Sequence, residues 1–333
     1  MESQLHQPLK AVAEFSPSIL CTREVLGREY RVRIGGQAGI ILFPSLPKDW
    51  EPSRNSLGCP LKAPAGSTGL PFSQTDSKWG SLEYYPDGRA AVSKALLKFS
   101  HSADAANQCA DAVYEAYTVW LALFVKYIVL QTRQNTCKAV TIENNAANLQ
   151  IFRQEDENLK FCASGKPVNL WLNMPIDSNF ATSIQLDYAA SLASHGVWPR
   201  LQYRLLLEAY RARAEQDWRK VIFEAGSALE CCLVDRITET LQQSHRIDGE
   251  RLLKTYQGLK RLLELAKVLS IHIPDRDYKT TIFDPRNSVA HRAEFLPPNV
   301  AITALGECDK LIRELTPRLP EGNANTSLCK PLP

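Results

Sequence analysis

The chain lacks the features that mark secreted, zinc-binding and membrane-spanning proteins. Its nine cysteines are scattered with no C-x2-C spacing, so neither a disulfide framework nor a zinc site is predicted. The first residues lack the apolar core of a secretory signal. The most apolar run, residues 116–130, is shorter than a bilayer span and contains Lys126, which favours a buried helix. We therefore expect a cytoplasmic protein.

Strong net charge and a phosphate-binding glycine loop are also missing. The formal net charge is only +3, which does not by itself predict a nucleic-acid partner. Gly35 and Gly36, followed by Gly39, lack both the G-x-G-x-x-G spacing and a G-K-[ST] ending, so a hairpin turn is the better interpretation. The C-terminal part has no carboxylate cluster suited to magnesium. No cofactor and no metal are expected.

Residues 1–197 are predicted to form an α+β domain of unknown role, and a sensor or regulator is one interpretation. Residues 30–34 alternate apolar and basic side chains, which is typical of a half-buried strand, and residues 39–43 are expected to pair with them as a hairpin. A long helix is predicted at about 103–133. Prolines and glycines recur over residues 44–80 and predict a long irregular loop. Further strand candidates are residues 82–85, 89–92, 139–142, 149–152, 160–162 and 168–172.

Residues 198–316 change to helical periodicity and predict an antiparallel bundle of helices. Apolar positions indicate a helix from Pro199, a second from about Asp217 and a third over about residues 249–269. A fourth helix is expected to begin at Pro285, and residues 301–315 form a fifth. The tail, residues 317–333, has little to pack and is predicted to be disordered.

The stretch from Asp284 to His291 carries the strongest chemical pattern in the chain. Asp284 suits an N-cap and Pro285 suits the first helical position. Arg286 would then lie in the first turn, where a helix end favours an anion. Asn287 and His291 share a helix face, whereas Arg286 and His291 are about 140° apart. The ordinary alternative is an arginine paired with a carboxylate and a histidine packed in a helix interface.

The string DPRNSVAH, together with the preceding residues 199–233, resembles the HEPN family (higher eukaryotes and prokaryotes nucleotide-binding domain). In this family a helical bundle carries an Arg-x(4–6)-His ribonuclease motif. Arg286 and His291 match that motif, and Asn287 occupies the polar position that commonly follows the arginine. The resemblance covers residues 198–316 and implies a HEPN-like bundle with these three residues as its catalytic group.

The resemblance implies an endoribonuclease that needs no metal, because RNA supplies its own nucleophile, the 2′-hydroxyl. His291 would act as base or acid. Arg286 would hold the phosphate oxygens, and Asn287 would orient the histidine or a phosphate oxygen. One motif supplies one imidazole, whereas the reaction is faster with two, one as the base and one as the acid. HEPN ribonucleases are two-fold dimers, so a homodimer through the bundle is expected here.

The expected substrate is tRNA or mRNA, and the expected role is that of a toxin or antiviral defence effector regulated by the N-terminal domain. Two alternatives stay open: a non-catalytic HEPN module that binds a nucleotide or a partner protein, and a scaffold whose bundle only dimerises. Either Glu224 or Glu230 could pair with Arg286. Six basic residues either line an RNA groove or form a solvated helix face: Arg200, Arg204, Arg211, Arg213, Arg219 and Lys220.

Overall fold

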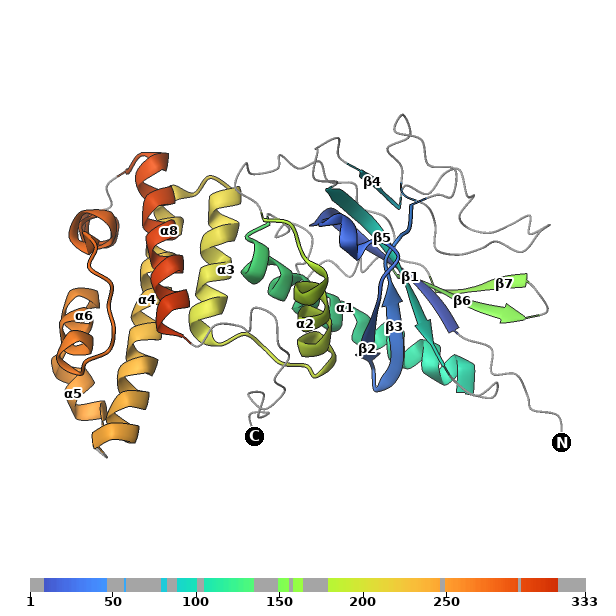
Figure 1. Ribbon diagram of the computed structural model, residues 1–333, viewed down its shortest axis with the longest axis horizontal. Helices are drawn as coiled ribbons and strands as arrows, with labels where there is room; N and C mark the ends of the chain where they lie inside the picture. Colours follow the sequence, from blue (N-terminus) through green and yellow to red (C-terminus); the bar gives the residue numbers. More distant parts are fainter. Residues whose placement is uncertain are drawn as a thin grey trace. The chain divides into compact units, whose positions relative to one another are not determined.

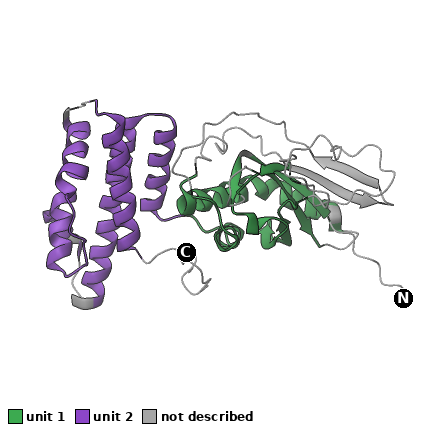
Figure 2. Ribbon diagram, turned by 45° about the horizontal axis from the view of Figure 1, so that its top comes forward, with its two compact units in different colours: residues 1–198, 326–333 green, residues 199–325 purple. Residues whose placement is uncertain are grey.

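The chain divides into two units, residues 1–198 with 326–333 and residues 199–325 (Figure 2). The computed structural model describes residues 9–46, 57, 79–82, 89–100, 105–134, 149–155, 158–163, 179–245, 249–292 and 295–316. The first unit contains an antiparallel sheet with helices, and the regular elements in the described part of the second are all helices. The chain is therefore an α+β part followed by an all-α part. The sequence analysis placed the change between residues 197 and 198.

The first unit is built on a seven-stranded sheet in the order β2-β3-β5-β1-β6-β7, with β4 paired to β5 beyond the end of β3. Every pairing between these strands is antiparallel. The register of β1 against β5 shifts between Glu14 and Ile19, which marks a bulge in the centre of the sheet. The strands are β1 (Leu9–Cys21), β2 (Glu29–Ile34), β3 (Gln37–Leu42), β4 (Gly80–Leu82), β5 (Ala90–Phe99), β6 (Leu149–Glu155) and β7 (Asn158–Ala163).

The hairpin predicted from the two glycines is confirmed as β2 and β3, which pair from Glu29 with Leu42 to Ile34 with Gln37. Gly35 and Gly36 both have positive φ, at 57° and 77°, as a tight two-residue hairpin turn requires. A Cβ at Gly35 would lie 2.1 Å from the carbonyl oxygen of Ala112. Glycine is therefore needed there for two reasons, the backbone conformation and the close approach of a helix.

The predicted long helix is α1 (Ala106–Thr132), which lies across one face of the sheet (Figure 1). Trp120 and Phe124 stack at 5.1 Å between ring centroids, and Phe124 also contacts Phe15 of β1. By length and composition alone, residues 107–132 could cross a membrane, but 67% of that apolar window is buried inside the protein. The helix forms part of the core, as the sequence analysis predicted from Lys126 and the length of the run.

Gln134 joins the end of α1 to the sheet. Its side-chain oxygen accepts a hydrogen bond from the Leu20 backbone N–H at 2.9 Å, and its amide nitrogen donates to the carbonyls of Leu20 and Asn179 at 2.6 and 3.1 Å. The side chain is 1% exposed. After β6 and β7 comes α2 (Ser183–Ser194), which packs along α1 and against β2 and begins at a capping box formed by Thr182 and Gln185.

In the second unit α4 contacts all the other α-helices, and Figure 1 shows α3 and α8 beside it. The predicted second helix starts where expected, because the Asp217 carboxylate accepts the Lys220 backbone N–H at 3.1 Å. Its predicted core positions from Val221 to Ile237 are buried. The helices are α3 (Leu201–Ala214), α4 (Trp218–Thr240), α5 (Gly249–Thr255), α6 (Leu259–Val268), α7 (Asp284–Asn287) and α8 (Pro298–Leu315).

Two details of the predicted bundle are wrong. The third helix is not continuous, because α5 ends at Thr255 and α6 begins at Leu259, with Gly258 between them at φ 89°. A helix cannot continue through that backbone conformation. In α3, periodicity predicts that the apolar Leu201 is buried and the polar Gln202 is not, whereas Leu201 is 48% exposed and Gln202 is fully buried.

Several sequence predictions lie outside the described residues. These are the strands at 139–142 and 168–172, most of the strand at 82–85, the tail at 317–333 and most of the Pro/Gly-rich segment at 44–80. Of that segment, Leu57 is described and donates its backbone N–H to the Gly80 carbonyl at 3.0 Å.

Candidate functional site

The Arg-x4-His motif lies on a helical segment of residues 279–292, called the motif helix below. It consists of a π-helical turn (Lys279–Phe283), α7 (Asp284–Asn287) and a second π-helical turn (Ser288–Arg292). Its parts pack against α4 and α8. A π turn widens the helix, and such turns occur often at functional sites.

The predicted start of this helix is wrong. Phe283, before Asp284, already has helical dihedrals of −71° and −49°, and the Asp284 side chain makes no cap hydrogen bond. Asp277 caps the segment instead, since its carboxylate accepts the Thr280 backbone N–H at 3.1 Å. Pro285 is thus inside the helix, where the preceding π turn accommodates its missing N–H. Arg286 is not in a first turn, so the argument for an anion at a helix N-terminus no longer applies to it.

Arg286 points inward and is fixed by α4. Its Nη2 donates to Oε2 of Glu230 at 2.5 Å, and the two side chains are 19% and 29% exposed. The structure therefore selects Glu230 from the two glutamates considered in the sequence. Gly226 makes room for the arginine, because a Cβ there would lie 2.7 Å from Cδ of Arg286. The Nε of Arg286 is buried and has no hydrogen-bond partner among the described residues.

His291 and Asn287 are both exposed. Within the described part of the chain, no hydrogen bond joins either of them to Arg286. The i→i+5 geometry of the second π turn brings residues 286 and 291 nearer to one face than the 140° of a regular α-helix. Even so, one chain presents an inward guanidinium and an outward imidazole, and does not by itself join them in one site.

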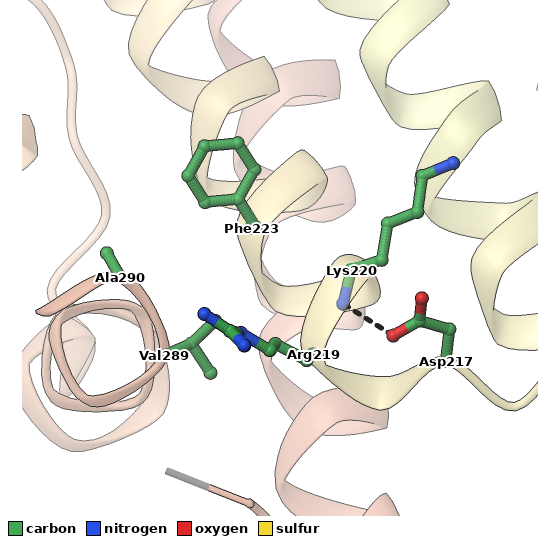
Figure 3. Close-up of a pocket in the computed structure, with 6 residues that line it drawn as sticks. All are labelled: Asp217, Arg219, Lys220, Phe223, Val289 and Ala290. Carbon is green, nitrogen blue, oxygen red and sulfur yellow. Dashed lines mark hydrogen bonds between the residues drawn. The ribbon is translucent and has the colours of Figure 1, made fainter. Parts of the chain in front are cut away.

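A hollow of about 290 Å³ opens beside the motif helix (Figure 3). The residues lining it come from the start of α4 and from the second π turn of the motif helix: Asp217, Arg219, Lys220, Phe223, Val289 and Ala290. The Arg219 side chain extends from α4 toward Val289, and Phe223 stands one turn further along α4. Ala290 immediately precedes His291 in the sequence, whereas His291 itself is not among the residues that line the hollow.

The charges of the hollow are unevenly paired. The Asp217 carboxylate caps α4, and the Lys220 amine lies 3.3 Å from a carboxylate oxygen of Glu208. Arg219 is exposed and has no ion-pair partner among the described residues. Phe223 is 46% exposed, which is unusual for so large an apolar side chain.

The six basic residues singled out in the sequence do not form one groove. Arg200 lies 3.6 Å from Glu239, and Arg211 lies 3.1 Å from Glu215, so both belong to ordinary surface ion pairs. Of that group, Arg219 and Lys220 line the hollow. Phe223 was missed by the sequence analysis, because a single aromatic at a helical position does not reveal whether it is buried or exposed.

Among the described residues there is no group of three or more His, Cys, Asp or Glu side chains arranged to hold a metal ion. Comparison with known proteins gives no match to this chain, whether to a protein-family model, a curated protein or a solved structure.

Proposed function

We propose that the second unit is a HEPN-like helical module and that the protein is a metal-independent endoribonuclease active as a homodimer. The proposal rests on the motif residues Arg286, Asn287 and His291. The observation that carries it furthest is the exposed imidazole of His291 on a helix whose neighbouring residue, Ala290, lines a hollow. The hollow also presents the exposed ring of Phe223 and the guanidinium of Arg219, which has no ion-pair partner among the described residues. These are the group types that bind and cleave single-stranded RNA.

In the proposed reaction the imidazole of one protomer takes the proton from a ribose 2′-hydroxyl. The 2′-oxygen attacks the adjacent phosphorus, and the bond from phosphorus to the 5′-oxygen breaks. The imidazole of the second protomer donates a proton to that 5′-oxygen as it leaves. The products are a 2′,3′-cyclic phosphate and a 5′-hydroxyl. Because His291 is exposed, a second copy of the chain has access to it.

Arg286 contributes a permanent positive charge at the base of this site. Glu230 accepts from Nη2 and the Nε is buried, so the donors left for a phosphate oxygen, as negative charge develops in the transition state, are those of Nη1 and the second N–H of Nη2. The same ion pair orients the motif helix on α4. Asn287, which is exposed on the motif helix as His291 is, would hydrogen-bond a phosphate oxygen or the imidazole.

The proposal extends to a cytoplasmic toxin or antiviral effector that cleaves tRNA or mRNA, with the first unit regulating the second. This wider context depends on the family resemblance alone.

A second candidate function is a non-catalytic module that binds a nucleotide or a partner protein. The Glu230–Arg286 pair favours it, because an arginine held by a half-buried carboxylate is a common structural arrangement. The two candidates differ in whether RNA is cut.

Total tRNA incubated with the purified full-length protein in the presence of EDTA distinguishes them. We expect cleavage into fragments that end in 2′,3′-cyclic phosphate, detected by gel electrophoresis and end-group analysis. His291→Ala should lower the rate at least about 100-fold, because it removes a general acid and base.

His272→Ala is the matched control, since His272 is another exposed histidine of the same unit and precedes the motif helix. It should cleave at the wild-type rate. Equal cleavage by the wild type and by His291→Ala would exclude the catalytic assignment, and nucleotide binding without any cleavage would favour the second candidate.

A further inference from the structure

We propose that the hollow beside the motif helix binds one unpaired nucleobase of the RNA strand, stacked on Phe223, with the phosphate of the same nucleotide held by Arg219. The inference rests on the proposed ribonuclease function and adds to it the part of the substrate that the site recognises.

The exposure of Phe223 is the first argument. The ring is 46% exposed at the edge of a hollow whose opposite wall is formed by Val289 and Ala290. An apolar wall facing an aromatic ring leaves a slot that suits a flat, π-rich ligand. Bases stack on aromatic side chains whatever their identity, which is how single strands are bound without sequence preference. At about 290 Å³, the hollow is close to the lower limit of small-ligand sites.

The charge distribution is the second argument. Of the two cations lining the hollow, Lys220 lies within 3.3 Å of Glu208 on α3, whereas Arg219 has no such partner in the described chain. Arg219 extends across the hollow toward Val289. The Asp217 carboxylate already caps α4 and disfavours a phosphate at that helix end. A phosphate entering the hollow would therefore be held by the guanidinium, which suits it through paired N–H donors.

The position on the motif helix is the third argument. Ala290 lines the hollow and is the residue before His291, so an RNA strand that enters the hollow also contacts the helix that carries the imidazole. A base inside a duplex cannot stack on Phe223 without leaving its partner. Cleavage should therefore favour single-stranded segments and loops over paired stems.

The test measures binding separately from cleavage. The full-length His291→Ala protein, which leaves the RNA intact, is titrated into a labelled single-stranded oligoribonucleotide and followed by fluorescence anisotropy. Adding Phe223→Ala should weaken binding about 5- to 100-fold, whereas Phe223→Tyr and Phe223→Trp should retain it because they keep a ring. Phe223→Leu should behave as alanine does. Arg219→Gln should weaken binding and make the salt dependence shallower by about one phosphate contact.

Phe295→Ala is the matched control, because Phe295 is also exposed, at 85%, and follows the motif helix without lining the hollow. It should bind RNA as the parent does. Circular dichroism and light scattering on each variant verify folding and oligomeric state.

The outcomes separate this inference from the proposed function. Unchanged RNA affinity in Phe223→Ala would overturn the base-binding site even if His291-dependent cleavage were found. Phe223-dependent binding by a protein that never cleaves RNA would support the base-binding site and reject the nuclease. Dissociation of an RNA-free dimer by Phe223→Ala would assign the ring to a protein interface and overturn the inference. Competition by free mononucleotides as strong as that by the oligonucleotide would overturn the RNA assignment in favour of a free nucleotide.

Discussion

At the scale of single residues, the geometry of the motif depends on a glycine on the neighbouring helix. Gly226 lets the aliphatic part of Arg286 lie directly on the α4 backbone, and one turn further along α4 Glu230 receives the guanidinium. Glycine is unfavourable inside a helix by about 1 kcal/mol relative to alanine. At position 226 this loss is offset by the space that the glycine leaves for Arg286, which explains why a glycine stands inside α4.

Two glycine-to-alanine changes test this. Gly306 of α8 has no neighbouring atom within 4 Å of an added Cβ, so Gly306→Ala should stabilise the protein by about 0.5–1 kcal/mol through helix propensity. Gly226→Ala should displace Arg286, and its free energy of unfolding should be at least about 1 kcal/mol below that of Gly306→Ala. Urea denaturation measures both. A Gly226→Ala protein as stable as Gly306→Ala would show that Arg286 moves aside without loss.

At the scale of elements, two connections hold helices where local sequence would not place them. The motif helix keeps Pro285 in its interior because a π-helical turn precedes it, and its packing on α4 and α8 stabilises that geometry. In the first unit, the side-chain amide of Gln134 hydrogen-bonds the backbone N–H and carbonyl of Leu20, as a neighbouring strand would. Both are connections between parts of the chain that are distant in sequence.

Gln134→Ala should cost about 1–3 kcal/mol in the free energy of unfolding, because the Leu20 N–H would be left without its acceptor in a buried position. The carbonyl of Leu20 keeps the Ala181 N–H as a donor at 2.8 Å, so it remains satisfied. Thermal or urea unfolding gives the value.

Gln131→Ala is a suitable comparison, since Gln131 is half-buried and donates only to the carbonyls of Tyr127 and Gln185. Its loss should stay below about 1 kcal/mol. Similar losses for both variants would indicate that the role of Gln134 is packing and not pairing with Leu20.

At the scale of the whole molecule, the proposed chemistry requires two chains. Arg286 is directed inward and His291 outward, and one chain supplies a single motif imidazole where the reaction uses a base and an acid. A two-fold axis near the motif helix would bring two imidazoles to one phosphate.

Mixed dimers test that requirement. If both imidazoles act in one site, a mixture of equal amounts of wild type and His291→Ala, dissociated and reassociated, should keep only about one quarter of the wild-type activity, the share of dimers with two intact motifs. Cleavage rates of the mixture and light scattering of the species provide the measurement. Retention of about one half would mean that each protomer acts alone.

Much of the fold could be predicted because its signals are local. The alternation of apolar and basic residues before two glycines predicted the β2–β3 hairpin. The long apolar run predicted α1, and Asp217 as an N-cap predicted the start of α4. The capping box of α2, Thr182 with Gln185, was equally visible and was missed. β1 escaped prediction because its alanines have low strand propensity, and only pairing on both sides makes it a central strand.

The sequence by itself determined the division into an α+β part and a helical part, the periodicities of most helices and the Arg-x4-His pattern on which the proposed function rests, because these depend on neighbours within one or two turns. The tertiary structure decided that Asp277 and not Asp284 caps the motif helix, that Glu230 and not Glu224 holds Arg286, and that Arg219 and Phe223 border the same hollow as Ala290. Those facts depend on how α4 and α8 pack against the motif helix, and contacts such as that of Glu230 with Arg286, 56 residues apart, leave no local trace in the sequence.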